Sequence, residues 1–532
     1  MIASSLIKSA LSTLPKKTAK AEKQFIEDFY KQIPSEDITS LDPDEIADIG
    51  HRHYEAGIKR ARRDYVEIKT IEKDLDERRV KRTVIEVITD DRPFTLDSIA
   101  SELSAQGLVI NLSVHTAFHM DKTKDGICYL TEPSETSYAQ GHLHIELNSY
   151  VAHSNVAPLK ARLKSILNDV EAATDDWQKM RVRLRACQKS LSLAPTDYPE
   201  HEIEEYLNFL EYLYKDNFTF LGYREYTFSG KDKNVQSHAV KGESLGVLRE
   251  KTPVYIDDND DGLPPALQML RKSQPPVSVS KVNKKSTVHR RVPLDAIAVK
   301  LFDDKGNVTG EALFIGLFTS VTYSRSIQSI PYLRLKADTV INTAGYNMGG
   351  HNDKALRHIL EKYPRDELFQ TDIKQLTKIC RSILRLQERE RIALYTRTDP
   401  FGRYISCLVY IPRSRYSTRM RLKFQRILEK ELGGECTNYT SQVDDSSLCR
   451  VLYTIHHKKR NAPKFDNCAI EAKLQEIGKL WRERLTHTLL ENTLHDEAHV
   501  VELIDKYGEA FPLSYRDSYS LMDAASDIDK LE

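Results

Sequence analysis

The sequence lacks several features that would point to a particular class of protein. Lys and Arg total 78, Asp and Glu also total 78, and the formal net charge is zero. A neutral chain gives no support for a nucleic acid or an anionic membrane as its main partner. No stretch approaches the ~18 apolar residues of a membrane span. We therefore expect no nucleic-acid partner, no membrane partner and a cytoplasmic location.

Paired cysteines are missing as well. The seven cysteines are scattered along the chain, no two of them are spaced as CxxC, and their number is odd. This pattern fits a reduced intracellular compartment better than a disulfide scaffold or a zinc site built on cysteine.

Motifs for the common catalytic chemistries are also absent. The chain has no GxGxxG or GxxxxGK[ST] nucleotide loop, no HExxH zinc motif and no GxSxG nucleophile elbow. The nearest glycine-rich string runs from Gly345 to Lys354. A helix start there can hold an anion, but a turn capped by Asn352 or Asp353 is the more common structure. We expect no catalytic, cofactor-binding or metal-binding residue in this chain.

Two polar patterns leave alternatives open. His142 and His144 lie on the same face of an expected strand and can approach a metal, yet no Cys, Asp or third His stands at a matching spacing. Solvated strand residues are therefore the favoured interpretation. The basic run at 281–285, followed by Ser286–Arg291, can hold a phosphate or a nucleotide. An edge strand is favoured, because Lys on an edge also discourages unwanted pairing.

Residues 81–190 carry the clearest periodicity. An apolar run at 83–88 predicts a strand, and apolar residues at i, i+3, i+4 and i+7 over 96–103 predict a helix. Alternation at 110–114 and again at 143–147 predicts two strands, and 159–170 is a second amphipathic helix. The order β-α-β-β-α, with room for a final strand, is typical of a ferredoxin-like layer of two helices on an antiparallel sheet.

The rest of the chain is divided by its patterns. Residues 1–80 are expected to be helical, and 389–485 repeat the first plan as β-β-α-β-α. Between these segments, strands at 296–302 and 312–318 form a hairpin, and Pro264 to Pro276 bracket a loop. The predicted fold class is α+β, with tandem ferredoxin-like (ACT-type) βαββαβ-related modules and helical connections.

Several long strings resemble the N-terminal, ACT-domain region of the large bacterial NAD-specific glutamate dehydrogenases. The first is the string TVIEVITDDRPFTLDS, and the others follow in the order of the family. The strings lie at Thr83–Ser98, Asp216–Arg224, Ser286–Arg290, Gly316–Ser320, Tyr363–Gln370 and Asp399–Pro412.

The resemblance implies a domain plan. Its parts are an N-terminal helical segment (1–80), ACT-like domain 1 (81–190), ACT-like domain 2 with insertions and helices (200–388), ACT-like domain 3 (389–485), and a helical linker (486–532) toward a catalytic domain.

The resemblance also implies a role. Complete family members oxidise L-glutamate with NAD and water to 2-oxoglutarate, ammonia and NADH as cytoplasmic homo-oligomers. From it we expect a regulatory and oligomerisation part without a catalytic domain, inactive alone, whose partners are other copies, the missing dehydrogenase domain and an amino-acid effector. The alternatives are a free-standing ACT-type amino-acid sensor and a non-functional gene remnant.

ACT-type modules bind small effectors at their interfaces, so the resemblance places a candidate effector site at Asp90, Asp91, Phe94 and Asp97. Backbone N–H groups at that helix start can receive a carboxylate, and Asp90 or Asp91 can take an ammonium group. Simple capping of the helix is the competing interpretation. The string Arg92-Pro93 stands where pockets of this family often have a glycine.

Overall fold

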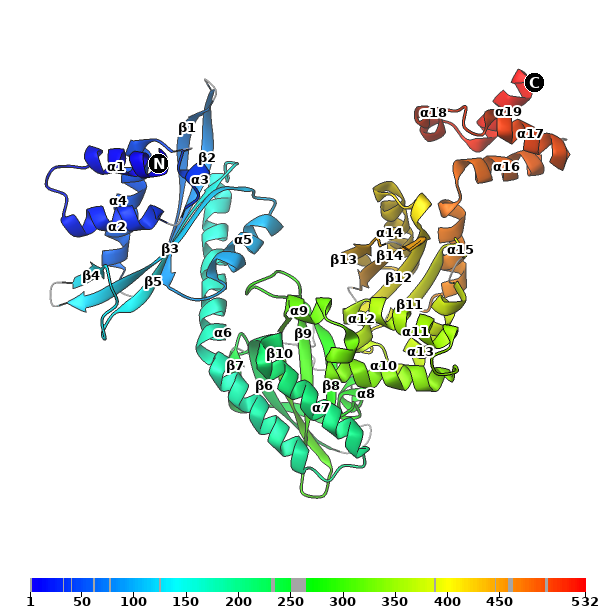
Figure 1. Ribbon diagram of the computed structural model, residues 1–532, viewed down its shortest axis with the longest axis horizontal. Coiled ribbons are helices and arrows are strands. Elements are labelled where there is room, and N and C mark those ends of the chain that lie inside the picture. Colours follow the sequence, from blue (N-terminus) through cyan, green and yellow to red (C-terminus); the bar gives the residue numbers. More distant parts are fainter. Residues whose placement is uncertain are drawn as a thin grey trace. The chain divides into compact units, whose positions relative to one another are not determined.

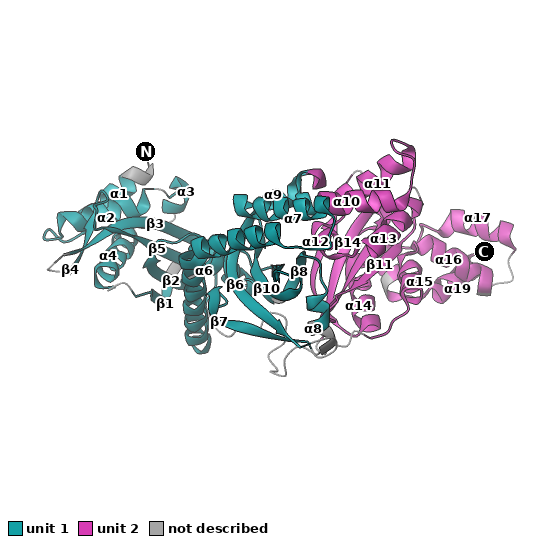
Figure 2. Ribbon diagram, turned by 90° about the horizontal axis from the view of Figure 1, so that it is seen from below, with its two compact units in different colours: residues 1–325, 329–332 teal, residues 326–328, 333–532 magenta. Residues whose placement is uncertain are grey.

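The computed structural model describes residues 2–532 except 32, 40, 61–62, 76–77, 124–125, 231–234, 250–264, 387–388, 445, 458–462 and 493–495. The chain divides into two compact units, residues 1–325 with 329–332, and residues 326–328 with 333–532 (Figure 2). The boundary therefore falls inside the segment 200–388, which the sequence suggested as one domain.

The first sheet contains five antiparallel strands in the order β1-β2-β5-β3-β4 (Figure 1). Helices α5 (Thr95–Ala105) and α6 (His153–Leu193) contribute to the apolar core on one of its faces. The strand bounds are β1 Tyr65–Leu75, β2 Arg78–Asp90, β3 Ile110–Thr123, β4 Gly126–Leu130 and β5 Tyr138–Leu147. Strands β2, β3 and β5 and helices α5 and α6 lie where the sequence predicted β-α-β-β-α, but β4, between β3 and β5 in the chain, was not predicted.

Strand β1 corrects the expectation that residues 1–80 are all helical. Val66 and Ile68 alternate with polar residues and are buried in the core. The whole strand pairs with β2, from Tyr65 opposite Ile88 onward. It lies at one edge of the sheet, beside β2. Residues beyond 170 continue α6, which is 41 residues long.

The opposite face of the first sheet is covered by the N-terminal helices. They are α1 (Ile2–Thr13), α2 (Lys20–Tyr30), α3 (Ser35–Ile38) and α4 (Pro43–Lys59). Helix α4 starts with a reciprocal capping box between Asp42 and Glu45, which satisfies two backbone N–H groups at its N-terminus. Phe25 and Phe29 of α2 stack near Phe118 of β3 in this second core. The sheet is thus buried on both faces.

The second sheet also belongs to the first unit and follows a different plan. Its order is β7-β6-β10-β9-β8. The bounds are β6 Phe218–Ser229, β7 Gln236–Gly246, β8 Val277–Lys285, β9 Pro293–Phe302 and β10 Val308–Phe318, with α7 at Glu200–Tyr212 and α9 at Ser320–Ser324. The β9–β10 hairpin is confirmed, and Gly306 supplies the positive φ of 81° that its turn requires.

The expected loop between Pro264 and Pro276 is partly wrong. Residues Pro265–Lys272 form helix α8, while 264 lies outside the described residues. A proline at the first helical position costs no hydrogen bond, so Pro265 does not exclude a helix. Because β6 pairs with β7 and with β10, and β9 lies between β8 and β10, this sheet does not repeat the order of the first.

The third sheet lies in the second unit and has the order β11-β12-β14-β13. Its elements are β11 Ala393–Thr398, β12 Tyr404–Pro412, α14 Thr418–Leu432, β13 Glu435–Gln442, β14 Leu448–His456 and α15 Asn467–Gly478. The sequence predicted β-β-α-β-α here, and β13 is the additional strand. It is an edge strand whose side chains are nearly all exposed, so it carries no apolar alternation.

Helices complete the second unit. Helices α10 (Pro331–Ala344), α11 (His351–Lys362), α12 (Arg365–Gln370) and α13 (Ile373–Leu386) precede the third sheet. Helices α16 (Trp481–Asn492), α17 (Glu497–Tyr507), α18 (Leu513–Ser518) and α19 (Leu521–Leu531) follow it and share a small core of their own. Within the described residues, no helix combines the length and apolar character that crossing a membrane requires.

Candidate functional site

The predicted effector residues sit at the turn from β2 into α5. Oδ1 of Asp90 accepts a hydrogen bond from Nη2 of Arg60, 2.8 Å away. Arg92 turns toward α6, where it contacts Glu171 at 3.2 Å and also Asp175. Phe94 adopts a left-handed backbone conformation, with φ of 71°, and precedes α5 without a side-chain cap.

The other end of this turn packs against the loop that follows β8. Nδ1 of His289 lies 3.0 Å from Oδ2 of Asp97, and its ring lies 5.0 Å from the ring of Phe94. The backbone N–H of His289 donates to Oγ of Ser98 at 2.9 Å. Asp91 is exposed. These contacts draw the four predicted side chains in different directions, because Asp90 faces Arg60 while Phe94 and Asp97 face His289.

Two other sequence candidates have structural roles. In the glycine-rich string, Oδ2 of Asp353 accepts the backbone N–H of Gly349 at 3.1 Å and pairs with Arg357, so Asp353 fixes the turn before α11. The basic run 281–285 lies on β8, an edge strand as predicted. Lys281 pairs with buried Asp295 at 2.7 Å.

The expectation that His142 and His144 are solvated is wrong. Their exposed fractions are 0% and 1%. The alternation of β5 puts Leu143 and Ile145 in the core with α5 and α6, as predicted, and turns the histidines to the other face. Helix α4 covers that face, so both faces of β5 are buried.

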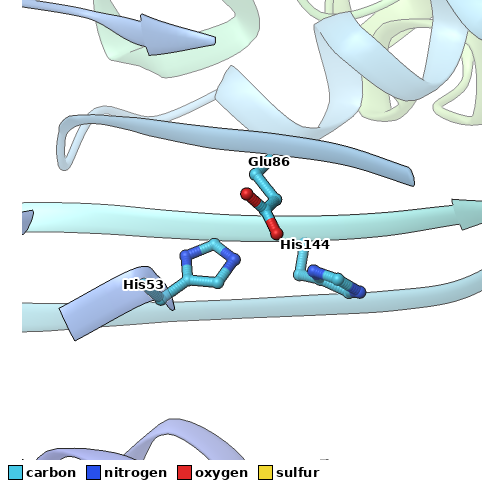
Figure 3. Close-up of side chains that lie close together, drawn as sticks. All are labelled: His53, Glu86 and His144. Carbon is cyan, nitrogen blue, oxygen red and sulfur yellow. The ribbon is translucent and has the colours of Figure 1, made fainter. Parts of the chain in front are cut away.

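A third histidine completes a buried cluster that the sequence pattern did not reveal. His53 of α4 is 1% exposed, and one ring nitrogen lies 3.4 Å from Nδ1 of His142, across 89 positions of sequence. Glu86 of β2 pairs directly with His144 of β5 across the sheet. His53, Glu86 and His144 lie close together (Figure 3), and one ligand atom from each lies within 4.8 Å of the others.

The buried carboxylate of Glu86 is paired with two cations. Oε1 of Glu86 accepts from Nε of Arg52 at 2.8 Å, and Oε2 accepts from Nζ of Lys69 at 3.1 Å. Burial acts to raise the pKa of Glu86, but the positive charges of Arg52 and Lys69 outweigh it and hold that pKa below its usual value. Glu86 is therefore a buried carboxylate anion held between two cations.

Two histidines of the cluster, His53 and His142, are neutral. Burial, with the nearby charges of Arg52 and Lys69, lowers the pKa of His53 to about 3. Burial likewise holds the pKa of His142 well below its ordinary value, followed by the influence of His53 and Arg60. Neutral imidazoles can act as ligands or as hydrogen-bond relays, since each keeps one nitrogen with a free lone pair.

A hollow of about 530 Å³ lies beside this cluster, along α4 and the start of β1. Its lining is rich in cations, and two of them, Arg52 and Lys69, also hold Glu86. A third lining cation, Arg60, pairs with Asp90. The positive charge of the hollow is thus largely engaged by carboxylates of the protein. Its full lining is His51, Arg52, Glu55, Ala56, Lys59, Arg60, Arg63, Asp64, Tyr65 and Lys69.

Comparison with known proteins gives four matches to glutamate dehydrogenase domain families. They are the ACT1 domain at residues 25–163, helical motif 1 at 330–389, the ACT2 domain at 393–482 and helical motif 2 at 489–532. The ACT1 match includes the second half of α2, α3, α4 and β1, and the ACT2 match falls on the module that the sequence placed third.

Similar proteins include three that are named NAD-specific glutamate dehydrogenase. The protein of Halomonas elongata is 30% identical over 97% of this chain and 32% of its own length. That of Pseudomonas aeruginosa is 28% identical over 89% of the chain and 29% of its own length. That of Mycobacterium tuberculosis is 24% identical over 84% of the chain and 27% of its own length. The chain thus spans about a third of the length of these relatives or somewhat less.

These relatives correct the expected role. The sequence suggested the N-terminal regulatory and oligomerisation part of an NAD-specific glutamate dehydrogenase, with no catalytic domain in this chain, or else a free-standing amino-acid sensor or a gene remnant. The relatives align with 84–97% of this chain, and all three carry the name of the enzyme itself. This expected role is therefore wrong. The chain is thus similar to glutamate dehydrogenases in four regions, two of which are described as ACT domains of that enzyme.

Proposed function

We propose that the whole protein is an NAD-specific glutamate dehydrogenase, which converts L-glutamate, NAD and water to 2-oxoglutarate, ammonia and NADH. The observation that carries this proposal is the 30% identity to the Halomonas elongata enzyme along 97% of the chain. Similarity that extends across both compact units is harder to explain by one shared small domain than by a shared protein.

The domain order supports the same proposal. ACT1, helical motif 1, ACT2 and helical motif 2 of glutamate dehydrogenase follow one another along the chain without overlap. The ACT regions coincide with the first and third sheets, which share the order of four strands, with β4 added at the edge of the first. Since a fold alone does not define an activity, the proposal depends on these family matches and not on the sheets themselves. We assign neither NAD nor glutamate to particular residues of the described chain.

The test is an assay of the native protein. The polypeptide that contains these residues is tagged at its gene, purified from the source organism and supplied with L-glutamate and NAD. We expect glutamate-dependent NADH formation with stoichiometric 2-oxoglutarate, and a much slower reaction with NADP. A strain without the gene controls for other dehydrogenases. If the intact purified protein reduces no NAD with glutamate, the proposal fails.

A further inference from the structure

A chain of hydrogen bonds fixes the protons of the buried histidines. Nε2 of Gln140 faces the backbone carbonyl of Gly57 at 3.5 Å, which leaves Oε1 to accept from Nε2 of His142 at 2.7 Å. Neutral His142 then has its lone pair on Nδ1. This nitrogen faces Nδ1 of His53 at 3.4 Å, so His53 must donate there. The lone pair of His53 consequently resides on Nε2.

This lone pair has no complementary partner. Within the part of the chain that the structure describes, the buried Nε2 of His53 has no hydrogen bond. The ring of His53 is directed at the gap between Glu86 and His144 (Figure 3). A nitrogen lone pair beside a buried carboxylate is unfavourable, because both are electron donors and neither brings a proton. A cation in the gap would satisfy both groups.

The donor set selects the kind of cation. Two imidazoles and a carboxylate suit Zn²⁺ and similar transition-metal ions, whereas Mg²⁺ and Ca²⁺ prefer oxygen ligands only. Each oxygen of Glu86 accepts one hydrogen bond, from Arg52 or Lys69, and a carboxylate oxygen can engage two partners. The hydrogen bond between His53 and His142 also orients the ring, as the outer partners of metal-bound histidines do.

We propose that His53, Glu86 and His144 form a buried binding site for one divalent transition-metal ion of the Zn²⁺ class, which links α4 to strands β2 and β5. The role is structural and independent of the dehydrogenase activity. A bound ion favours the folded state because the unfolded chain holds no such site. The charges of Arg52 and Lys69 oppose a divalent cation, so they reduce the affinity below that of the same ligands alone.

The experiment titrates the full chain, freed of metal by chelation, with Zn²⁺ in a calorimeter and follows the melting temperature. Co²⁺ then serves as a spectroscopic probe, since four-coordinate Co²⁺ gives visible absorption. We expect one ion per chain, a higher melting temperature and no such response to Mg²⁺. His53→Gln and His144→Gln should lower the affinity by at least tenfold. His153→Gln is the matched control, because His153 begins α6 and is exposed.

A second variant keeps the test decisive if the buried substitutions impair folding. Lys69 is 38% exposed, so Lys69→Gln is expected to fold while removing a charge that opposes the ion. Its affinity for Zn²⁺ should rise severalfold. Unchanged or weaker binding in Lys69→Gln overturns the proposal. So does Zn²⁺ binding that His53→Gln and His144→Gln leave intact, which would mean that exposed residues bind the ion.

Discussion

The first and third sheets place equivalent strands in the same order, yet their second faces are built differently. In each, one face packs its apolar residues under the two helices of its own module, α5 and α6 or α14 and α15. The first sheet turns His142 and His144, together with Glu86, under α4. The third turns charged side chains under the helices that precede it.

On the second face of the third sheet and in the turn that follows β11, buried arginines pair with carboxylates. Arg397 of β11 binds Glu367 of α12 through two hydrogen bonds of 2.6 and 2.8 Å. In the following turn, both side chains of the Asp399–Arg403 pair are 1% exposed. The comparison indicates that one sheet plan accommodates two ways of burying polarity. Neutral rings need a relay of protons, whereas buried charges need bidentate partners.

The largest expected effect comes from breaking the bidentate pair. Arg397→Leu leaves the carboxylate of Glu367, whose side chain is 7% exposed, without its partner. Removing one member of a buried pair typically costs about 3–5 kcal/mol. Urea unfolding, with hydrogen exchange of β12 to locate the change, should show a loss of this size. The exposed pair Arg415–Glu483 is the control, and Arg415→Leu should cost less than about 1 kcal/mol. Equal losses of stability in Arg397→Leu and Arg415→Leu would contradict the conclusion that the buried pair stabilises the charged face of the third sheet.

The apolar faces of the first and third sheets should lose similar stability when a buried leucine is shortened. Leu103 of α5 and Leu428 of α14 are both fully buried against their sheets. Leu103→Ala and Leu428→Ala should each destabilise their own unit by about 2–5 kcal/mol, through lost burial and the cavity left behind. Urea denaturation of each variant measures this. A loss in only one of the two would break the equivalence of the modules.

Acid should weaken the first unit through His53. Its pKa is lowered by burial to about 3, while the unfolded chain retains the ordinary 6.5. The unfolded state therefore binds the proton first as pH falls from 6.5 toward 3, and stability is lost over that window at up to about 1.4 kcal/mol per pH unit. Urea midpoints in the presence of a chelator, at several pH values, test this against His53→Gln. A parallel pH dependence of the two proteins would contradict it.

Alkali should strengthen the second unit through Lys336. Burial, with Arg397 nearby, lowers its pKa from 10.5 to about 7, and its Nζ faces the carbonyls of Leu368 and Phe369. Between pH 7 and 10.5 the unfolded state carries the extra proton, so stability should rise with pH in that window. Lys336→Met removes this group, and its stability relative to the parent should fall as pH rises. A constant difference would refute the assignment.

The smallest effect concerns how the equivalent helices begin. Ser417 caps α14 by accepting the backbone N–H of Met420 at 3.1 Å, whereas Phe94 precedes α5 without a side-chain cap. Ser417→Ala should cost about 1 kcal/mol, and Ser417→Asn should retain most of the stability. Hydrogen exchange in the first turn of α14 reports the change directly. Equal protection in the two variants would mean that the cap contributes little.

Local pattern was sufficient where a residue's environment follows from its neighbours in sequence. The alternation around Leu143 and Ile145 predicted β5 and its apolar face, and the hairpin near Gly306 followed from its turn residues. Strand β13 was missed because an exposed edge strand has no reason to alternate. Strand β1 was assigned to a helical segment although Val66 and Ile68 already alternate.

The candidate metal site depends on long-range packing and was not predictable in this way. His142 and His144 were recognised as a pair on one face, but their burial depends on α4, which comes about 90 positions earlier. The register that sets Glu86 opposite His144 is fixed by the pairing of β2 with β5. The usable sequence signal would have been polar residues on the second face of a strand whose sheet is covered on both sides.

Helix α6 has a mechanical consequence for the first unit. Leu159 and Leu163 near its start belong to the core of the first sheet, while Asp176 farther along accepts the backbone N–H of Gly246 at the end of β7. Its 41 residues form one continuous helix that passes both sheets and changes direction between them (Figure 1). A rotation of the first sheet is therefore transmitted to the second sheet through continuous helical backbone and not through a flexible loop.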